Sequence, residues 1–587
     1  MNKNCYLITT ADERTWKFDR RVIFLGEWCR IYNRKYIWNN MSGNTIPWQG
    51  SNRIKIKKDY LYLNDLYEKV LTNLTHELNN IHKTNHSLRY WRIVIGPWLL
   101  TYIGVLWDRW ESIRLFGDSK VECETVVPNL DFKFLVSDDY EHALKLMSES
   151  DVWNYSIYSE ILKVQNHRSI KLIKSDISLD NEHELSANKS HSLIYHFVMG
   201  VDKFISKIVK TNTHNFVFYN TYLPNKFLIK LFYKLGQYPR LYSEFNIKMS
   251  NNTDNSFIRP QLEKEQVANT FEQFLYRRVF KDMPKIYLEG YKMLSQYCMS
   301  LSNAQVIFTA NAHLGNDVFK TWSAKQVDNG AQLIIGEHGG AIRSLMSMFE
   351  HEEKICDKKT VWHIEYDNKH TKLTPNKLFK KKTKNNDSDQ IILVGREIPR
   401  YSYKIESGPN SSLNIDDFNQ TVDLINLLDK KTRALFKVRP YSNMGWFTKD
   451  RYSDLYGKEI ISKKKTLFQD FERSKLIICT YPQTTFSEAM HSEIPTILLY
   501  KEEFWELQPI FDNLVMELKK ADIIHSDPVK AAKHINNISS NPRIWWNKEE
   551  TKKARNMFFN LCGTVSNDPL SEWVNFFKRI QSKQLKF

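Results

Sequence analysis

Residues 475–500 read KLIICTYPQTTFSEAMHSEIPTILLY, and this stretch decides the fold class. Its apolar run Lys475–Cys479 predicts a buried strand, and Pro495–Tyr500 predicts a second one. Between them, the polar loop Thr480–Thr484 leads into a helix predicted over residues 485–492. A strand, a helix and a strand at this spacing indicate neighbouring parallel strands joined by a helix.

The same alternation of strands and helices extends upstream through the C-terminal part of the chain. Strands are predicted at Gln390–Gly395 and Ala434–Val438, and helices at Phe418–Leu428 and Thr466–Arg473. Short strands that are apolar throughout are buried on both faces, so helices must cover both sides of their sheet. We therefore predict a C-terminal Rossmann-like domain over residues 390–525.

The N-terminal half is predicted to hold a second α/β domain with helical insertions. Its expected strands are Cys5–Thr9, Val22–Gly26, Phe132–Val136, Asn215–Tyr219, Gln305–Thr309 and Gln332–Gly336, and its clearest helix is Leu61–His82. The polar stretch Lys369–Asp389 predicts the linker between the two domains. The expected division is residues 1–368 for the N-terminal domain, 369–389 for the linker, 390–525 for the C-terminal domain and 526–587 for helices that pack back on the domains.

The composition is that of a globular protein with an excess of positive charge. The 587 residues include 84 Lys and Arg against 67 Asp and Glu, which gives a formal net charge of +17. This balance suits an anionic substrate or an anionic membrane face, and equally a solvated surface that is rich in Lys. The basic runs lack the interleaved aromatic residues of a single-strand binder, so no nucleic-acid partner is predicted.

The cysteines and the chain start indicate a reducing compartment. Seven scattered cysteines, none in CxxC spacing, argue against a disulfide framework and against a zinc site. The first residues lack the basic and then apolar pattern of a signal peptide. The uncharged run Ile93–Trp107 is shorter than the roughly 20 apolar residues of a spanning helix, so we expect a buried or interfacial helix. A cytoplasmic protein is predicted, with peripheral attachment to the inner face of the membrane left open.

The loop that opens the predicted helix at Thr485 is the first candidate site. It lies at the carboxyl end of a strand, where ligands of parallel sheets bind. Backbone N–H groups and the helix dipole favour an anion there, and the hydroxyls of Thr484, Thr485 and Ser487 add donors. We predict that they hold the phosphate of a nucleotide, with Glu488 on the ribose hydroxyls. A plain helix cap is the alternative.

Two arginines follow strands of the same predicted sheet. Arg439 lies at the end of the strand Ala434–Val438, and Arg396 directly follows Gly395. A guanidinium at either position can neutralise the phosphate of a leaving group, and Arg439 is the stronger candidate. The alternative for Arg439 is a surface residue in the turn at Pro440.

A glycine-rich loop in the N-terminal half carries residues suited to proton transfer. The loop Gly336-Glu337-His338-Gly339-Gly340 follows an apolar strand, and its glycines permit a ligand to approach the backbone. Glu337 and His338 are candidate catalytic residues, as is Glu27 at another predicted strand end. If the two domains face each other, this loop lies across the cleft from the phosphate site. The alternatives are a tight turn for the loop and a helix cap for Glu27.

Three further charged residues are candidates for substrate binding. Arg92 and Asp108 bracket the apolar run Ile93–Trp107, where a contact with acceptor or lipid and a buried salt bridge are both open. Arg343 is, with Arg92 and Arg396, a further cation able to bind an anionic group of a substrate.

No metal and no cofactor are predicted. Asp387-Ser388-Asp389 is a D-x-D, but it precedes a strand, whereas metal-dependent transferases place theirs after one, and HExxH is absent. Cations of the protein and a helix terminus would then take the charge of the leaving group.

Several of these motifs together resemble a bacterial family of surface-polysaccharide transferases. They are Leu25–Cys29, Arg89–Trp98, Gly336–Gly340, Arg439–Tyr441, Thr484–Glu488 and Ile494–Thr496, and the resemblance runs nearly end to end. The glycine-rich and Ser/Thr-rich loops are also similar to those of Kdo transferases and sialyl-type transferases. This chain departs from the family pattern at Glu337, where the family has Gln, at Ala341-Ile342 and at Trp362-His363-Ile364.

The resemblance implies a GT-B-like α/β fold, in which two Rossmann-like domains face a cleft, with helical insertions and C-terminal helices. It implies a metal-independent glycosyltransferase with a nucleotide-sugar donor, a CMP-activated ulosonic acid being favoured, and a glycan or glycolipid acceptor. By the same similarity, Thr484, Thr485 and Ser487 hold the CMP phosphate, and Arg439 stands where related enzymes have a His-Pro pair. A transferase that uses UDP- or GDP-sugars and a non-catalytic glycan-binding scaffold are the alternatives.

Overall fold

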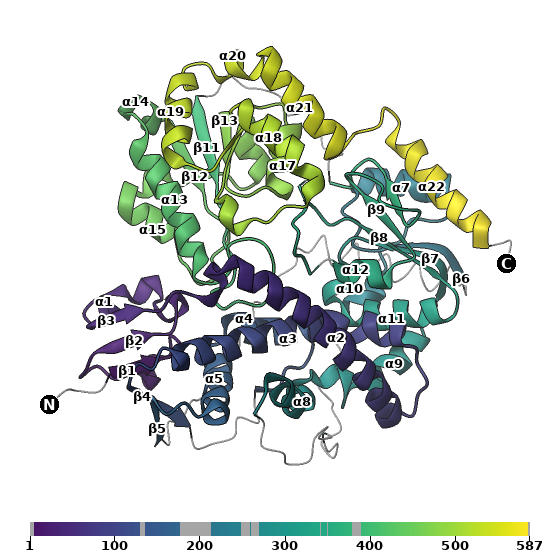
Figure 1. The fold of residues 1–587 in the computed structure, drawn as a ribbon. Coiled ribbons are helices and arrows are strands. Elements are labelled where there is room, and N and C mark those ends of the chain that lie inside the picture. The colour runs from purple at the N-terminus through teal and green to yellow at the C-terminus, as the bar shows by residue number, and fades with distance from the viewer. Residues whose placement is uncertain are drawn as a thin grey trace.

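The computed structural model describes residues 5–128, 135–175, 213–247, 259, 269–340, 342–348, 350–377 and 389–584. Within these residues the strands form three five-stranded sheets whose strand pairs are all parallel. Figure 1 shows an N-terminal sheet at the lower left, a middle sheet at the right and a C-terminal sheet at the top. The predicted α/β class is confirmed.

The N-terminal sheet has the order β3-β2-β1-β4-β5, the middle sheet β10-β9-β8-β7-β6 and the C-terminal sheet β12-β11-β13-β14-β15. The bounds are β1 Cys5–Ile8, β2 Val22–Phe24, β3 Gly43–Thr45, β4 Cys123–Pro128, β5 Ile170–Ser175, β6 Thr213–Phe218, β7 Asn303–Thr309, β8 Gln332–Gly336, β9 Lys358–Val361, β10 His370–Lys372, β11 Gln390–Val394, β12 Phe436–Arg439, β13 Ser474–Cys479, β14 Thr496–Leu499 and β15 Ile524–His525. The sequence predicts one α/β unit in the N-terminal half, and the structure divides that half into two sheets. Apolar runs locate strands but do not determine which of them pair.

Helices cover these sheets and connect them. In the N-terminal part they are α1 Lys35–Trp38, α2 Arg53–His82, α3 Leu88–Asp118, α4 Tyr140–Glu149 and α5 Asp151–Gln165. Around the middle sheet they are α7 Asn225–Lys234, α8 Phe271–Asp282, α9 Tyr291–Met299, α10 Ala312–Gly315, α11 Asp317–Asp328 and α12 Glu350–Ile355. From residue 413 onward they are α13 Leu413–Leu427, α14 Lys430–Ala434, α15 Thr448–Tyr456, α16 Leu467–Glu472, α17 Thr484–His491, α18 Asp512–Lys520, α19 Pro528–Ile538, α20 Pro542–Trp546, α21 Glu549–Leu561 and α22 Pro569–Gln584.

The predicted linker contains a strand, and parts of it and of two other predicted segments lie outside the described residues. The stretch 369–389 includes all of β10, a strand of the middle sheet. Residues 378–388 lie outside the described residues, as do residues 132–134 of the strand predicted at Phe132–Val136 and two residues of the D-x-D at 387–389.

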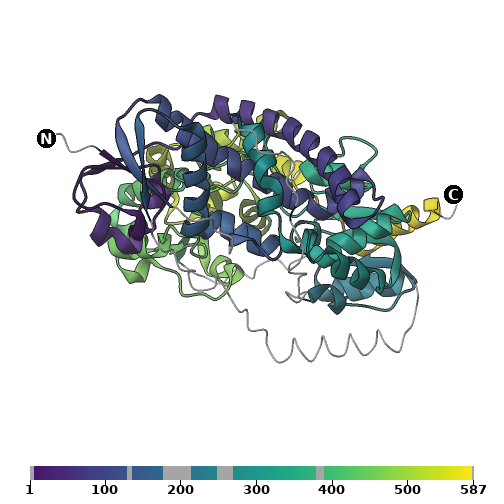
Figure 2. The same ribbon diagram turned by 90° about the horizontal axis from the view of Figure 1, so that it is seen from below.

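Two long helices form a layer between the sheets. Helix α2 starts at Arg53, because the Asn52 side chain caps it by accepting from the Lys55 N–H. Helix α3 contains the apolar run Ile93–Trp107 and is buried along most of its length, as expected for a core helix. Among the described residues, no helix is long and apolar enough to cross a membrane. Figure 2 shows the two chain termini at opposite ends of the molecule.

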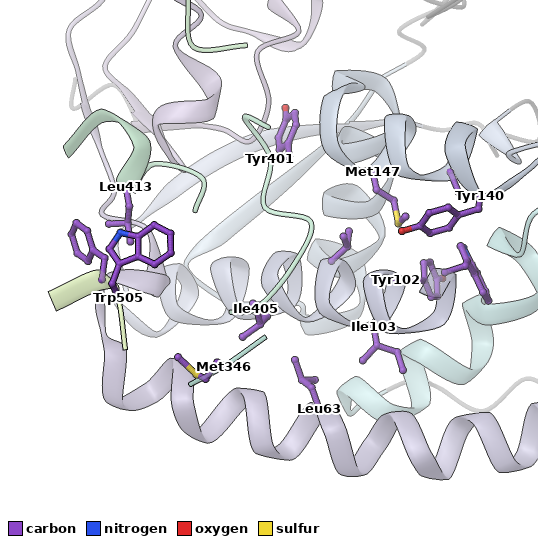
Figure 3. Close-up of a cluster of buried hydrophobic side chains, with 14 of the residues drawn as sticks. Leu63, Tyr102, Ile103, Tyr140, Met147, Met346, Tyr401, Ile405, Leu413 and Trp505 are labelled. Atoms are coloured by element: carbon purple, nitrogen blue, oxygen red, sulfur yellow. The ribbon is translucent and has the colours of Figure 1, made fainter. Parts of the chain in front are cut away.

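One hydrophobic core cluster joins residues from all parts of the described chain. Figure 3 shows Ile405, which follows β11, near Leu63 of α2 and near Met346, which lies between β8 and α12. At the C-terminal end, α22 packs on the middle sheet, where Phe577 lies edge-on to Phe218 with ring centroids 4.9 Å apart. The last helix therefore covers a different sheet from the one that precedes it in the sequence.

Candidate functional site

A glycine brings the middle and C-terminal sheets into contact. The loop Gly336–Gly340 follows β8, and Thr484 begins α17 after β13. A Cβ atom on Gly339 would stand 2.2 Å from Thr484 Oγ1. That is far inside van der Waals contact, so any other residue would force the loop or the Thr484 side chain to move. The loop and the helix start, which are far apart in the sequence, thus lie side by side.

Helix α17 presents an N-terminus without a side-chain cap at this contact. Its N-cap residue Gln483 makes no side-chain hydrogen bond, and the first N–H groups of a helix have no partner within it. Together with the helix dipole, such groups attract an anion. The Thr485 hydroxyl is hydrogen-bonded to the Tyr481 phenol. The Ser487 hydroxyl is fully buried and has no hydrogen-bond partner among the described residues. Of the predicted hydroxyls, Thr484 is the one that meets the loop.

His338 is a titratable residue of this loop, and its side chain packs against Tyr222. Its ring meets Tyr222 edge-on with centroids 5.2 Å apart, and Lys377 Nζ lies 4.3 Å from the centre of the same Tyr222 ring. Burial and then the charge of Lys377 lower the pKa of His338 to about 4. The imidazole is therefore neutral at pH 7, and a neutral imidazole can accept a proton.

Glu337 supports the loop from within the protein. Its Oε2 accepts from the Trp362 N–H at 2.7 Å and lies 3.2 Å from His363 Nδ1, while Arg343 Nε lies 3.8 Å from Oε1. Burial raises the pKa of Glu337, but the charges of His363 and Arg343 outweigh burial and the pKa is lowered. The carboxylate is ionised and paired, so Glu337 and Arg343 lie together in a cluster that holds the loop to the residues after β9.

Backbone hydrogen bonds join the segment after this loop to the C-terminal domain. The Leu345 N–H donates to Glu506 O at 2.7 Å, and the Gln508 N–H donates to Arg343 O at 2.9 Å. The Ser407 N–H donates to the carbonyl of residue 346 at 3.1 Å. These bonds fix the loop relative to α17 without using the side chains that could bind a ligand.

Arg396 lies at the carboxyl end of β11, the strand next to β13. Its Nη1 donates to Pro409 O at 2.9 Å, and its guanidinium carbon lies 5.2 Å from the Trp505 ring centre. Burial raises the pKa of Tyr481 to about 12, and the charges of Arg396 and Glu488 act on that phenol with opposite signs. Arg396 and Glu488 therefore both lie near the start of α17.

Arg439 is occupied inside the protein. It ends the edge strand β12, and its Nη1 donates to Asp470 Oδ2 at 2.6 Å and to Lys464 O at 3.1 Å. Because Asp470 is fully buried, this ion pair anchors α16 to the edge of the sheet. The phosphate-binding role of Arg439 stays a prediction, and the observed contacts are structural ones.

Glu27 lies against α13 rather than α17. Its backbone N–H donates to Ser412 Oγ at 3.0 Å, and its carboxylate pairs with Arg30 at 3.2 Å. The contacts of Glu27 thus join the N-terminal sheet to the C-terminal domain, and they do not include His338.

Arg92 and Asp108 both lie in the helical layer. Arg92 donates to both carboxylate oxygens of Glu68, at 2.8 and 2.7 Å. Asp108 is buried and accepts from Trp48 Nε1 at 2.7 Å and from Arg109 Nη1 at 2.6 Å. Of the two alternatives from the sequence, Asp108 shows the buried salt bridge, and Arg92 shows a salt bridge to a Glu68 side chain that is 37% exposed.

Residues 5–577 match the family described as LIC12162 family transferase. The chain belongs to this family. No curated protein sequence matches it.

Solved structures are distantly similar to this LIC12162 family transferase. MurG of Acinetobacter baumannii is 11% identical, with 62% of this chain and 99% of MurG covered and a TM-score of 0.33. The wall teichoic acid polymerase TagF, solved with CDPG, is 9% identical, with 67% and 100% covered and a TM-score of 0.33. S. aureus MnaA, solved with UDP, is 9% identical, with 63% and 97% covered and a TM-score of 0.37.

Sequence reasoning missed several residues around the site of this LIC12162 family transferase. Tyr222 and Lys377 lie beside His338, and Asp417 of α13 lies near Arg396. Burial raises the pKa of Asp417 to about 6 against the charge of Arg396, and such perturbed carboxyls are frequent at functional sites. Tyr222 follows β6, so the rule that ligands bind at the carboxyl ends of parallel strands could have identified it. Lys377 lies in the predicted linker, where no such rule applies. In the described part of the chain, no group of three or more His, Cys, Asp or Glu side chains is placed to hold a metal ion.

Proposed function

We propose that this LIC12162 family transferase is a metal-independent GT-B-type glycosyltransferase. The contact between Gly339 and Thr484 carries the proposal, because it joins a loop with a titratable His to the anion-attracting start of a helix. Transfer from a nucleotide sugar needs both a phosphate site and a group that takes the proton of the acceptor hydroxyl. The favoured donor is a CMP-activated ulosonic acid, and the favoured acceptor is a bacterial surface polysaccharide or lipopolysaccharide.

In the proposed reaction the bond between the anomeric carbon and the phosphate oxygen breaks. Negative charge grows on the phosphate, where the N–H groups that open α17 and the Thr484 hydroxyl stabilise it. Arg396 supplies a cation near the same helix start. Neutral His338 takes the proton of the attacking acceptor hydroxyl, and Glu337 keeps the loop in position.

An acid sugar also needs a cation for its own carboxylate. Arg92 and Arg343 are paired with Glu68 and Glu337, so neither is favoured for this task. Arg396 and Lys377 are the favoured cations, since both lie beside the proposed site. Their two charges suit a donor that carries a carboxylate and a phosphate.

A thermal-shift screen of the full chain against CMP, CDP, UDP, GDP and dTDP, with and without EDTA, tests the donor. A ligand that binds only the folded state raises the melting temperature. A selective shift with CMP that persists in EDTA is expected. A shift with UDP or GDP alone would replace the CMP donor, and no shift with any nucleotide would favour the non-catalytic scaffold.

Variants then test the assigned residues. Thr484→Ala should weaken binding of the nucleotide identified by the screen, whereas Thr551→Ala, at a buried threonine of α21, should leave that affinity unchanged. His338→Ala should abolish transfer while the nucleotide still binds. Substantial turnover by His338→Ala would remove this residue from the mechanism.

A further inference from the structure

Helix α7 exposes apolar and basic side chains on its outer face. Ile229 is 44% exposed and Tyr233 is 66% exposed, although large apolar side chains are usually buried. Lys226 and Lys230 are exposed on the same helix. Spacings of four residues, 226 to 230 and 229 to 233, place these side chains in two adjacent stripes. The opposite face of α7 buries Leu231 and packs on the core.

Residues around this face of α7 add further exposed apolar and basic side chains. Tyr238, just beyond the helix, is 67% exposed. No Asp or Glu occurs between Thr213 and Ser243. Helix α22 lies beside α7, as Figure 1 shows, and exposes Lys578 and Arg579. We call Lys226, Ile229, Lys230, Tyr233 and Tyr238 together the α7 surface.

We propose that the α7 surface docks on an anionic phospholipid bilayer. Aliphatic and tyrosine side chains enter the headgroup region, while neighbouring lysines pair with anionic headgroups. Both lysines are exposed, and neither has an ion-pair partner in the described part of the chain, so both charges are available to a partner. A second copy of the chain is disfavoured, because an isologous contact would bring these lysines and the +17 net charge together.

Helix α7 lies close in the chain to the proposed site, so docking there would bring a membrane near that site. Tyr222, which contacts His338, lies three residues before Asn225, where α7 begins. A bilayer bound to α7 would therefore lie near Tyr222 and the proposed site, where it would present a lipid-linked acceptor. This use rests on the proposed function, whereas the docking itself depends only on the α7 surface.

Vesicle flotation of the full chain tests the docking. Wild type is expected to bind phosphatidylcholine vesicles that contain about 30% phosphatidylglycerol and not pure phosphatidylcholine vesicles. Lys226→Gln/Lys230→Gln should lower the partition coefficient roughly 30-fold, at about 1 kcal/mol per lysine. Lys530→Gln/Lys533→Gln on α19 removes the same net charge elsewhere and should change binding less than about threefold. Ile229→Ser/Tyr233→Ser should also weaken binding, and Val529→Ser on α19, at a residue 57% exposed, should not.

Three results would overturn the proposal. One is wild-type binding without preference for anionic vesicles, and another is equal loss in both lysine pairs, which would indicate net charge alone. The third is a concentration-dependent dimer that Ile229→Ser/Tyr233→Ser dissociates, which would make this face a contact between copies. Nucleotide affinity of Lys226→Gln/Lys230→Gln should equal that of wild type, so failure of docking and failure of the transferase proposal are distinguishable.

Discussion

Replacing Gly339 with Ala should disconnect the loop from helix α17. The added Cβ would stand 2.2 Å from Thr484 Oγ1, whereas Thr484 Cβ would lie 3.3 Å away. Atoms in contact lie about 3.5 Å apart, so the loop or the hydroxyl must move by about 1 Å. Either movement displaces the hydroxyl from a bound phosphate. A hydrogen bond to a charged group contributes about 1.5–3 kcal/mol, so nucleotide affinity should fall roughly 10- to 150-fold.

Calorimetric titration of single and double variants measures whether the two residues act through this contact. Thr484→Ala alone should lose as much affinity as Gly339→Ala. In the Thr484→Ala background, Gly339→Ala should cost less than about threefold more, because the clashing oxygen is gone. Gly315→Ala, whose added Cβ meets nothing closer than 3.9 Å, is the control. Two independent losses that add in full would refute the coupling of the loop to the phosphate site.

Other variants separate structural from ligand-binding roles. Arg439→Ala leaves the buried Asp470 unpaired, so urea denaturation should show an unfolding free energy lowered by about 3 kcal/mol; weakened nucleotide binding at unchanged stability would instead restore its phosphate role. Arg396→Ala should do the reverse, lowering nucleotide affinity about tenfold while the unfolding free energy changes by less than about 1 kcal/mol. Burial lowers the pKa of His351 to about 3, so between pH 6.5 and 3 the unfolded chain binds a proton that the folded chain does not. Stability should therefore fall as the pH drops from 7 to 5, and His351→Gln should remove about 2 kcal/mol of that fall; an unchanged pH dependence would contradict the neutral buried state. The transfer rate should fall as the pH approaches 4, where His338 becomes protonated, and a rate loss centred near pH 6.5 would count against its lowered pKa.

The strands of the C-terminal sheet could be predicted from the sequence, whereas the pairing of the strands in the N-terminal half could not. Strands β11, β13 and β14 each contain an uninterrupted run of Ile, Leu or Val, which is the pattern of a strand buried on both faces. Helix α2 starts eight residues before the predicted Leu61, because the lysines among residues 53–58 hide the helical spacing. The division of the N-terminal half into two sheets depends on contacts between distant segments, and apolar periodicity carries no information about them.

The candidate site was predictable in outline for a similar reason. Both loops lie at the carboxyl ends of parallel strands, and this rule needs only the order of strands and helices. Whether a charged residue is available to a ligand depends on its partners, and these come from elsewhere in the chain. Asp470 lies 31 residues from Arg439, and Glu68 lies 24 residues from Arg92. The local sequence around these residues therefore predicts neither ion pair.

The middle sheet is covered by α22 only when synthesis of the chain is almost complete. Phe577 lies edge-on to Phe216 and Phe218, which the ribosome makes roughly 360 residues earlier. At about 5 to 20 residues per second, roughly 20 to 70 s pass between the two. For that interval this face of the nascent sheet lacks the cover of α22, and such exposed apolar surface favours association between unfinished chains. A stop codon before Pro569 would accordingly yield an aggregating product rather than a shortened enzyme.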